Sequence, residues 1–248
     1  MKKELRAFVF DMDGVLINSH SAHRKAWREF LRDQGVEVSD NELAFILEGR
    51  TRSEILRRFL GDLPASELQE CGRRKDDFFR CLEHQIEPVP GVLQLLDNLI
   101  KRGLSLAVAT SASEIRTFAT IERLGLGGCF DAVVTASDVE QGKPHPAVYR
   151  LACKRLEISP QFAMAFDDAR AGVEAAKSAG MRCIGVASNG LRQQLLLAGA
   201  EAVVPSFSCA EFDAVAKAIF KNEDLEKGGG IYKNMQSECG SEGSKPSG

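Results

Sequence analysis

Several features that would place a protein in a special class are missing from this chain. No apolar run approaches the roughly 20 residues that cross a membrane, and the seven cysteines include no Cys-x-x-Cys pair. Scattered cysteines are typical of free thiols in a reducing compartment, not of a disulfide framework or a zinc site. Asp11 interrupts the N-terminal apolar stretch too early for a signal peptide. We therefore expect a cytoplasmic protein that binds no membrane.

The chain also lacks a strong charge excess and internal repeats. Its formal net charge is −3, so the basic surplus typical of nucleic-acid-binding proteins is missing. An apolar content of 44% and a charged content of 27% are ordinary for a globular protein. The length of 248 residues allows one large domain or two unequal ones. A monomer with a small-molecule partner is the simplest expectation.

Strand and helix patterns alternate in the second half of the sequence. Apolar runs of strand length occur at residues 104–109, 132–135, 162–166, 182–187 and 202–204. Helical stripes lie between them, one of which is formed by Ile115, Phe118, Ala119 and Leu124. Alternation of this kind predicts βαβ units and a doubly wound, Rossmann-like parallel sheet.

The first strand, residues 7–10, stands apart from this rhythm. Ninety-three residues (11–103) separate it from the next strand, far more than the roughly 30 of a βαβ unit, and most of them carry helical stripes. We predict an α/β core formed by residues 1–17 and 89–222. Residues 18–88 are predicted to be an inserted helical domain on a hinge, and residues 223–248 a disordered tail.

The most informative motif is Asp11-Met12-Asp13-Gly14-Val15-Leu16, directly after the first strand. Residues two apart on an extended segment point the same way, so Asp11 and Asp13 can face one small volume. Two crowded carboxylates repel each other and need a cation or a proton. The plainer alternative is an Asp-rich turn at a strand end.

Three later segments place further polar groups at strand ends or before helices. They are Thr110-Ser111-Ala112-Ser113, Gly142-Lys143-Pro144 and Asp167-Asp168. The ordered set resembles the haloacid dehalogenase (HAD) superfamily of phosphotransferases, over about residues 5–215. The resemblance implies that a nucleophilic Asp11 forms an aspartyl-phosphate and that Asp13 is the general acid and base.

The resemblance also assigns the phosphate-holding residues and a metal. Ser111 and Lys143 would hold the phosphoryl group, although a helix cap and a solvated lysine are the structural alternatives. Mg²⁺ would be bound by the Asp11 carboxylate, the backbone carbonyl of Asp13 and Asp168. Asp167 would contact the direct ligands, or reach the ion through a water molecule. The alternative for the Asp167-Asp168 pair is a helix N-cap.

By the HAD resemblance, the helical insertion of residues 18–88 is a mobile cap that closes over the site. This cap carries a finer resemblance, to β-phosphoglucomutase and its relatives. It is found in residues 21–27, 49–52 and 74–75. By this resemblance the substrate-binding residues are His23, Gly49, Arg52, Lys75 and, from the core, Ser113. Stacking of His23 on Trp27, and solvation of the arginine and the lysine, are the structural alternatives.

One departure from the mutases decides which reaction we expect. The mutases follow the second serine of the Ser111 motif with a basic residue and an amide, where this chain has Glu114 and Ile115. A carboxylate repels phosphate, although Arg50 and Arg52 could compensate. We therefore expect a phosphatase acting on a small phosphorylated metabolite, with a mutase as the alternative. A phospho-receiver and a non-catalytic sugar-phosphate binder are more distant alternatives.

Overall fold

The computed structural model describes residues 4–46, 52–187 and 190–219. The chain divides into two compact units, Met1–Cys209 and Ala210–Gly248. In the second unit the described element is helix α10 (Ala210–Ile219), and the predicted tail lies outside the described residues. None of the described helices combines the length and the apolar content needed to cross a membrane.

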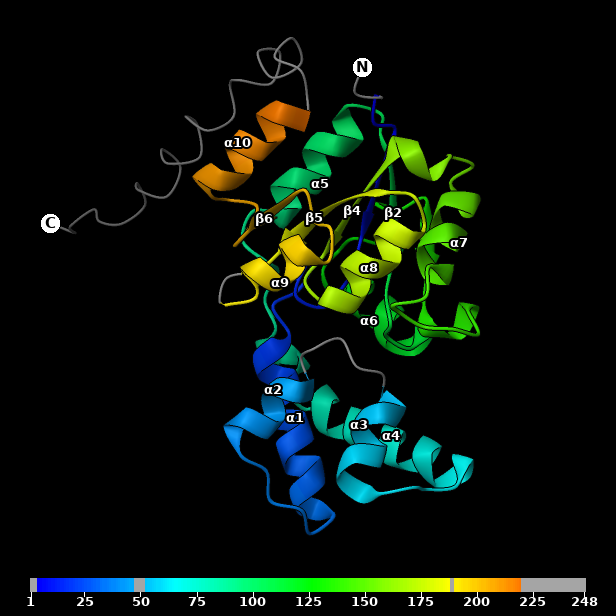
Figure 1. The fold of residues 1–248 in the computed structure, drawn as a ribbon, viewed down its shortest axis with the longest axis vertical. Coiled ribbons are helices and arrows are strands. Elements are labelled where there is room, and N and C mark those ends of the chain that lie inside the picture. Colours follow the sequence, from blue (N-terminus) through cyan, green and yellow to red (C-terminus); the bar gives the residue numbers. More distant parts are fainter. Residues whose placement is uncertain (1–3, 47–51, 188–189, 220–248) are drawn as a thin grey trace, which may run out of the picture. The chain divides into compact units, whose positions relative to one another are not determined.

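The first unit is built on a six-stranded parallel sheet (Figure 1). Its strands are β1 (Ala7–Phe10), β2 (Ser105–Ala109), β3 (Ala132–Val134), β4 (Ala163–Asp167), β5 (Arg182–Val186) and β6 (Ala202–Val204). The spatial order is β3-β2-β1-β4-β5-β6, which confirms the predicted Rossmann-like core. The order reverses between β1 and β4, and such a switch point is where α/β sheets place their ligands.

Helices cover the sheet because its strands carry apolar residues on both faces. Ala7 and Val9 belong to a core cluster that includes residues of α7 (Ala147–Arg155), α8 (Arg170–Ser178) and α9 (Arg192–Leu197). Phe8 and Phe10 point to the opposite face, where Phe10 stacks on Phe166 with ring centroids 5.1 Å apart. Each such buried aromatic contributes about 1.5–3 kcal/mol of transfer free energy. The polar strand ends are thereby held between two apolar layers.

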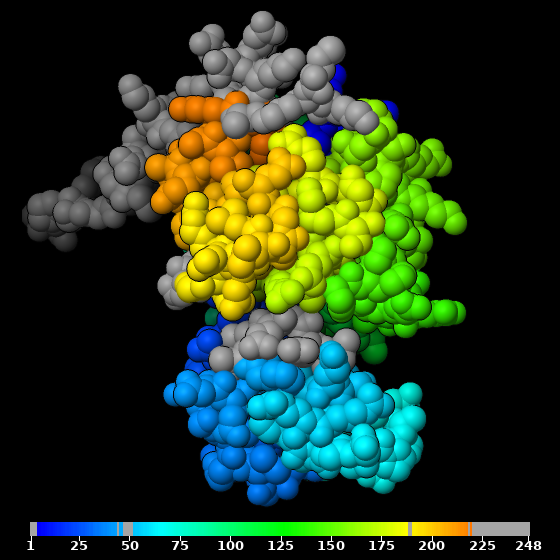
Figure 2. Space-filling model, in the orientation of Figure 1, coloured from blue at the N-terminus to red at the C-terminus, as the bar shows by residue number. Residues whose placement is uncertain are grey.

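The inserted region between β1 and β2 is helical, as predicted. It contains α1 (His20–Asp33), α2 (Asp40–Ile46), α3 (Arg52–Leu60), α4 (Ala65–Arg80) and the 3₁₀ turn η1 (Glu83–Gln85), followed by α5 (Val92–Lys101) of the core. Trp27, Phe30, Leu43 and Leu56 belong to a separate apolar cluster inside this region. Figure 2 shows the described parts of these helices (blue to cyan) packed together. A cluster of its own makes this region a cap domain and not a long loop.

Two chain segments connect the cap to the sheet, and they lie side by side. Asn18 donates its backbone N–H to the carbonyl of Glu87 at 2.8 Å, and Val89 donates to Leu16 at 3.0 Å. Ile17 and Pro88 form an antiparallel bridge between these two hydrogen bonds. The cap therefore leaves and rejoins the core at one point, directly beside the Asp11 loop.

The predicted apolar stripe of helix α6 (Glu114–Arg123) is wrong in part. Ile115 is 82% exposed and Phe118 is 49% exposed, whereas Thr117 and Ile121 are buried. The Thr117 hydroxyl donates to the carbonyl of Ser113 at 2.9 Å. Because that bond satisfies the hydroxyl inside the helix, the threonine can face inward at little cost.

We expect two isoleucines on α6 to respond differently to truncation. Ile121→Ala should lower the free energy of unfolding by about 2–4 kcal/mol, since it empties a buried position. Ile115→Ala should change it by less than about 0.5 kcal/mol. Urea denaturation of both variants measures the difference. Equal costs would contradict the observed orientation of the helix.

Candidate active site

The loop after β1 is shaped by tight backbone contacts. Leu16 donates its backbone N–H to the carbonyl of Met12 at 2.9 Å, and Gly14 adopts a φ of +72°. A Cβ on Gly14 would lie 2.1 Å from Oδ2 of Asp168. Glycine is thus required at this position for two reasons: the backbone has a positive φ, and a carboxylate approaches the Cα closely.

Three carboxylates from two strand ends meet beside this loop. Asp11, Asp167 and Asp168 are buried, and each offers an oxygen within 4.8 Å of the others. Lys143 Nζ donates to Asp11 at 2.9 Å and to Asp167 at 2.8 Å. Since Lys143 is only 8% exposed, the alternative of a solvated loop lysine is wrong.

Asp167 has partners on both oxygens. Its Oδ2 accepts from Lys143 and, at 2.6 Å, from the hydroxyl of Tyr149, and its Oδ1 accepts the backbone N–H of Ala169. A Cβ on Gly172 would lie 1.9–2.0 Å from the carboxylate atoms, so helix α8 approaches Asp167 closely. These contacts leave Asp11 and Asp168 as the carboxylates of the cluster with more freedom to bind an ion.

The charge of the cluster favours a divalent cation. Burial raises the pKa of Asp11 to about 8, with Asp167 and Asp168 adding to the rise and Lys143 opposing it. Burial also raises the pKa of Asp168. Lys143 is buried too, but its pKa is raised because Asp11 and Asp167 outweigh the burial. Three carboxylates and one ammonium carry two net negative charges when ionised, and oxygen donors suit a hard divalent ion.

Asp13 has a separate set of partners. Arg116 of α6 donates to both of its oxygens at 2.9 and 2.6 Å, and Ser19 Oγ donates to Oδ1 at 2.6 Å. His23 Nε2 lies 3.1 Å from the same oxygen. Although burial opposes ionisation, Arg116 and His23 hold the pKa of Asp13 well below its usual range. Asp13 is therefore ionised, and its carboxylate is not part of the three-carboxylate cluster.

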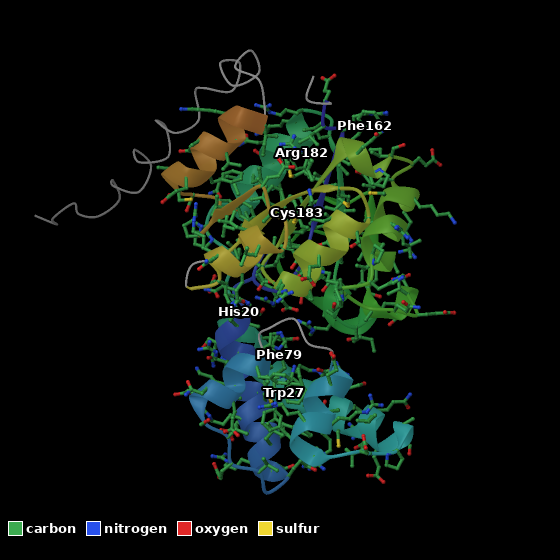
Figure 3. All side chains as sticks on the ribbon, viewed as in Figure 1. His20, Trp27, Phe79, Phe162, Arg182 and Cys183 are labelled. Atoms are coloured by element: carbon green, nitrogen blue, oxygen red, sulfur yellow. The ribbon has the colours of Figure 1, made fainter. Side chains whose placement is uncertain are left out.

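His23 connects Asp13 to the cap. Lys75 Nζ lies 3.2 Å from His23 Nδ1. Because the ionised Asp13 carboxylate can only accept, Nε2 carries the proton that points to Asp13, and Nδ1 is left to accept from Lys75. Burial, then Lys75, lowers the pKa of His23 to about 4. Its ring stacks on Phe79, centroid to centroid 4.3 Å, so the stacking partner is Phe79 and not Trp27 (both labelled in Figure 3).

Two further cap residues complete the cavity. Lys75 is only 4% exposed, which rules out a solvated position, and burial, then Arg116, lowers its pKa to about 7. Arg52 is half-exposed and pairs with Asp76 at 2.7 Å. Both basic residues line the same cavity as Asp11 and Asp168. The cavity is thus lined by carboxylates from the sheet and by three basic groups, Arg52 and Lys75 of the cap and Arg116 of α6.

The remaining predicted residues fall in different places. Ser111 lines the cavity, and the N-cap of α6 is Ser113, so the cap alternative for Ser111 is wrong. Ser113 is not among the described residues that line the cavity. Gly49, and Arg50 beside it, lie outside the described residues. The N-cap of α8 is Ala169, so neither aspartate of the pair before it is an N-cap.

Several residues that contact the site aspartates were not predicted from the sequence. They include Arg116 and Ser19 on Asp13, Tyr149 on Asp167, and His20, whose Nε2 lies 2.6 Å from Asp168 Oδ2. Arg116 directly follows the two positions, Glu114 and Ile115, at which the mutases have a basic residue and an amide. Tyr149 and His20 follow known motif segments by only a few residues, but spacing alone does not show that a side chain reaches back.

Comparisons with known proteins agree with this geometry. Residues 5–180 match the haloacid dehalogenase-like hydrolase family. Validoxylamine A 7'-phosphate phosphatase of Streptomyces hygroscopicus subsp. limoneus is 32% identical over 72% of this chain and 84% of its own. β-Phosphoglucomutase of Bacillus subtilis is 30% identical over 81% and 89%. A crystal structure of CbbY from Rhodobacter sphaeroides in complex with xylulose-1,5-bisphosphate is 30% identical, with a TM-score of 0.73 over 82% and 95%.

The chain therefore belongs to the haloacid dehalogenase-like hydrolases, in the group that carries a helical cap and includes β-phosphoglucomutase and CbbY. This membership leaves the phospho-receiver alternative without support. Within the family, the buried cluster of Asp11, Asp167 and Asp168 is a candidate divalent-metal site.

Replacing Lys143 tests the charge balance of this site. Lys143→Met should destabilise the metal-free protein by about 3 kcal/mol, since it leaves buried carboxylates without their cation. Added Mg²⁺ should then raise the melting temperature of the variant more than that of the wild type. Lys101→Met is the matched control, because Lys101 is exposed and pairs with Asp97 at the surface. A variant as stable as wild type without metal would contradict this account.

Proposed function

We propose that the protein is a Mg²⁺-dependent phosphatase that hydrolyses a small phosphorylated metabolite, namely a sugar phosphate, through an aspartyl-phosphate. One observation carries the proposal. Asp11 lies in a buried cluster with Lys143 and Asp168, while Asp13, two residues later, faces the same cavity with partners of its own. A nucleophile and an acid–base group are thus separated on one short loop.

The reaction would run in two displacements. A carboxylate oxygen of Asp11 bonds to phosphorus as the bond from phosphorus to the sugar oxygen breaks, and Asp13 supplies a proton to that oxygen. Water then bonds to phosphorus as the bond to Asp11 breaks, and Asp13 takes the proton of the water. Lys143 would stabilise the negative charge around the transferring group.

Arg116 determines when Asp13 can act. In this structure the guanidinium holds Asp13 ionised, which suits the base of the second displacement. The first displacement needs Asp13 protonated. An anionic or hydroxyl group of the substrate that draws Arg116 away would allow the pKa of Asp13 to rise. Substrate binding would therefore prepare the acid.

The residues present fit Mg²⁺. Asp11 and Asp168 offer carboxylate oxygens with net negative charge, and the backbone carbonyl of Asp13 would be the third protein ligand. When bound, the ion would neutralise phosphoryl oxygens. Asp167 would hold Lys143 and the start of helix α8 in place from behind, through the contacts described above.

The basic groups that line the cavity favour a phosphorylated polyol or sugar. Arg52 and Lys75 come from different cap helices and line the same cavity as Asp11. They would bind hydroxyl or anionic groups remote from the transferred phosphoryl group, and His23 would be positioned for a substrate hydroxyl. Relatives named for sugar-phosphate substrates support this choice.

One observation favours a mutase as the second candidate. Glu114 and Ile115 lack the basic group that mutases have after the serine pair, but Arg116 brings a guanidinium into the same cavity. A second phosphate could therefore be bound in the cavity despite those two residues, as transfer between sugar hydroxyls requires.

Replacing the nucleophile tests the proposed chemistry. Asp11→Asn should lower the rate of phosphate release by at least about a thousandfold, since the covalent step is lost. Circular dichroism should show an unchanged fold. The exposed Asp97→Asn variant is the control and should keep full activity. Turnover retained by Asp11→Asn would refute the assigned role.

The two candidate reactions give different products from the same mixture. With glucose 1-phosphate and a trace of the glucose bisphosphate, a phosphatase releases inorganic phosphate and a mutase forms glucose 6-phosphate. We expect phosphate release, also in a screen of sugar phosphates, nucleotides and phosphoglycolate. Accumulation of glucose 6-phosphate without phosphate would assign the mutase reaction instead.

A further inference from the structure

We propose that His20 is a positioning residue that links the cap to the metal site through Asp168. His20 is the first residue of α1, so it belongs to the cap, whereas Asp168 follows β4 of the core. Their side chains meet at 2.6 Å, Nε2 to Oδ2. Figure 3 shows His20 at the end of α1 nearest the sheet. The proposal rests on the metal site of the proposed function but not on its reaction.

The contact fixes the orientation of the Asp168 carboxylate. A hydrogen bond from the imidazole to Oδ2 holds the carboxylate in one rotamer. Gly14 has no side chain at this point, and a Cβ there would meet both Asp168 and, at 2.8 Å, His20 Nε2. Asp168 and the imidazole therefore share a space that only glycine leaves open.

His20 acts on the carboxylate and not on the ion. Among the described residues, the group that could hold a metal consists of the three aspartates, and the imidazole is not part of it. Hydrogen bonds to ligating carboxylates are known to tune metal affinity by roughly 10- to 100-fold. The position of His20 is that of such an outer partner.

The location of His20 gives this contact a second consequence. Ser19, the neighbouring residue, donates to Asp13 at 2.6 Å, and His23 reaches Asp13 one turn later. The start of α1 therefore contacts two different catalytic carboxylates directly after the paired linkers. A movement of the cap that shifts α1 would release Asp168 together with Asp13. By reciprocity, an ion that binds better to the oriented Asp168 must favour the cap position that orients it.

The first experiment measures metal binding without any substrate. Free Mn²⁺ is followed by electron paramagnetic resonance in titrations of wild type, His20→Ala, His20→Gln and the surface control His84→Ala. We expect about tenfold weaker binding for His20→Ala, partial recovery for His20→Gln, which keeps an N–H donor, and no change for His84→Ala. Wild-type affinity in folded His20→Ala would overturn the proposal.

The second experiment tests the link to the cap. Hydrogen exchange is measured by mass spectrometry on each protein, first without metal and then with enough Mn²⁺ to saturate that protein. In wild type, metal should slow exchange at the start of α1; in His20→Ala it should have little effect there. Equal slowing in both proteins would show that His20 does not transmit metal binding to the cap. Neither readout uses turnover, so failure of the proposed phosphatase reaction would remain distinguishable.

Discussion

The repulsion between buried carboxylates is the constraint on which the rest of the site depends. Asp11, Asp167 and Asp168 are brought together because β1 and β4 are neighbours at the point where the strand order reverses. Lys143 compensates only one of their charges. The remaining negative charge makes the cluster receptive to a divalent ion. The glycines at 14 and 172 allow the carboxylates this close to the backbone.

A second balance of charge operates at Asp13. This carboxylate comes from the same loop as Asp11, yet it has its own partners in Arg116, Ser19 and His23. Two aspartates two residues apart therefore have opposite pKa displacements, Asp11 upward and Asp13 downward. Separation of this kind allows neighbouring carboxyl groups to perform different chemistry. It depends on α6 and on the cap as much as on the loop itself.

The sheet and its motifs could be predicted because strand ends are encoded locally. Apolar runs followed by Asp11, Ser111 and Asp167-Asp168 determine where each side chain emerges, and parallel pairing then brings them to one edge. The orientation of α6 could not be predicted, because Thr117 is buried with its hydroxyl satisfied inside the helix. The roles of Arg116 and His20 could not be predicted for a related reason. Their roles arise from where a helix points in space, which residue spacing does not specify.

The paired linkers have a consequence for how this molecule could diversify. Because Leu16–Asn18 and Glu87–Val89 are hydrogen-bonded to one another, the core meets its insertion as a closed stem. An insertion of another length or shape could start and finish at the same stem without disturbing the order of the strands. Selectivity could then evolve by exchanging the inserted part, while the carboxylate cluster stays with the stem and the sheet.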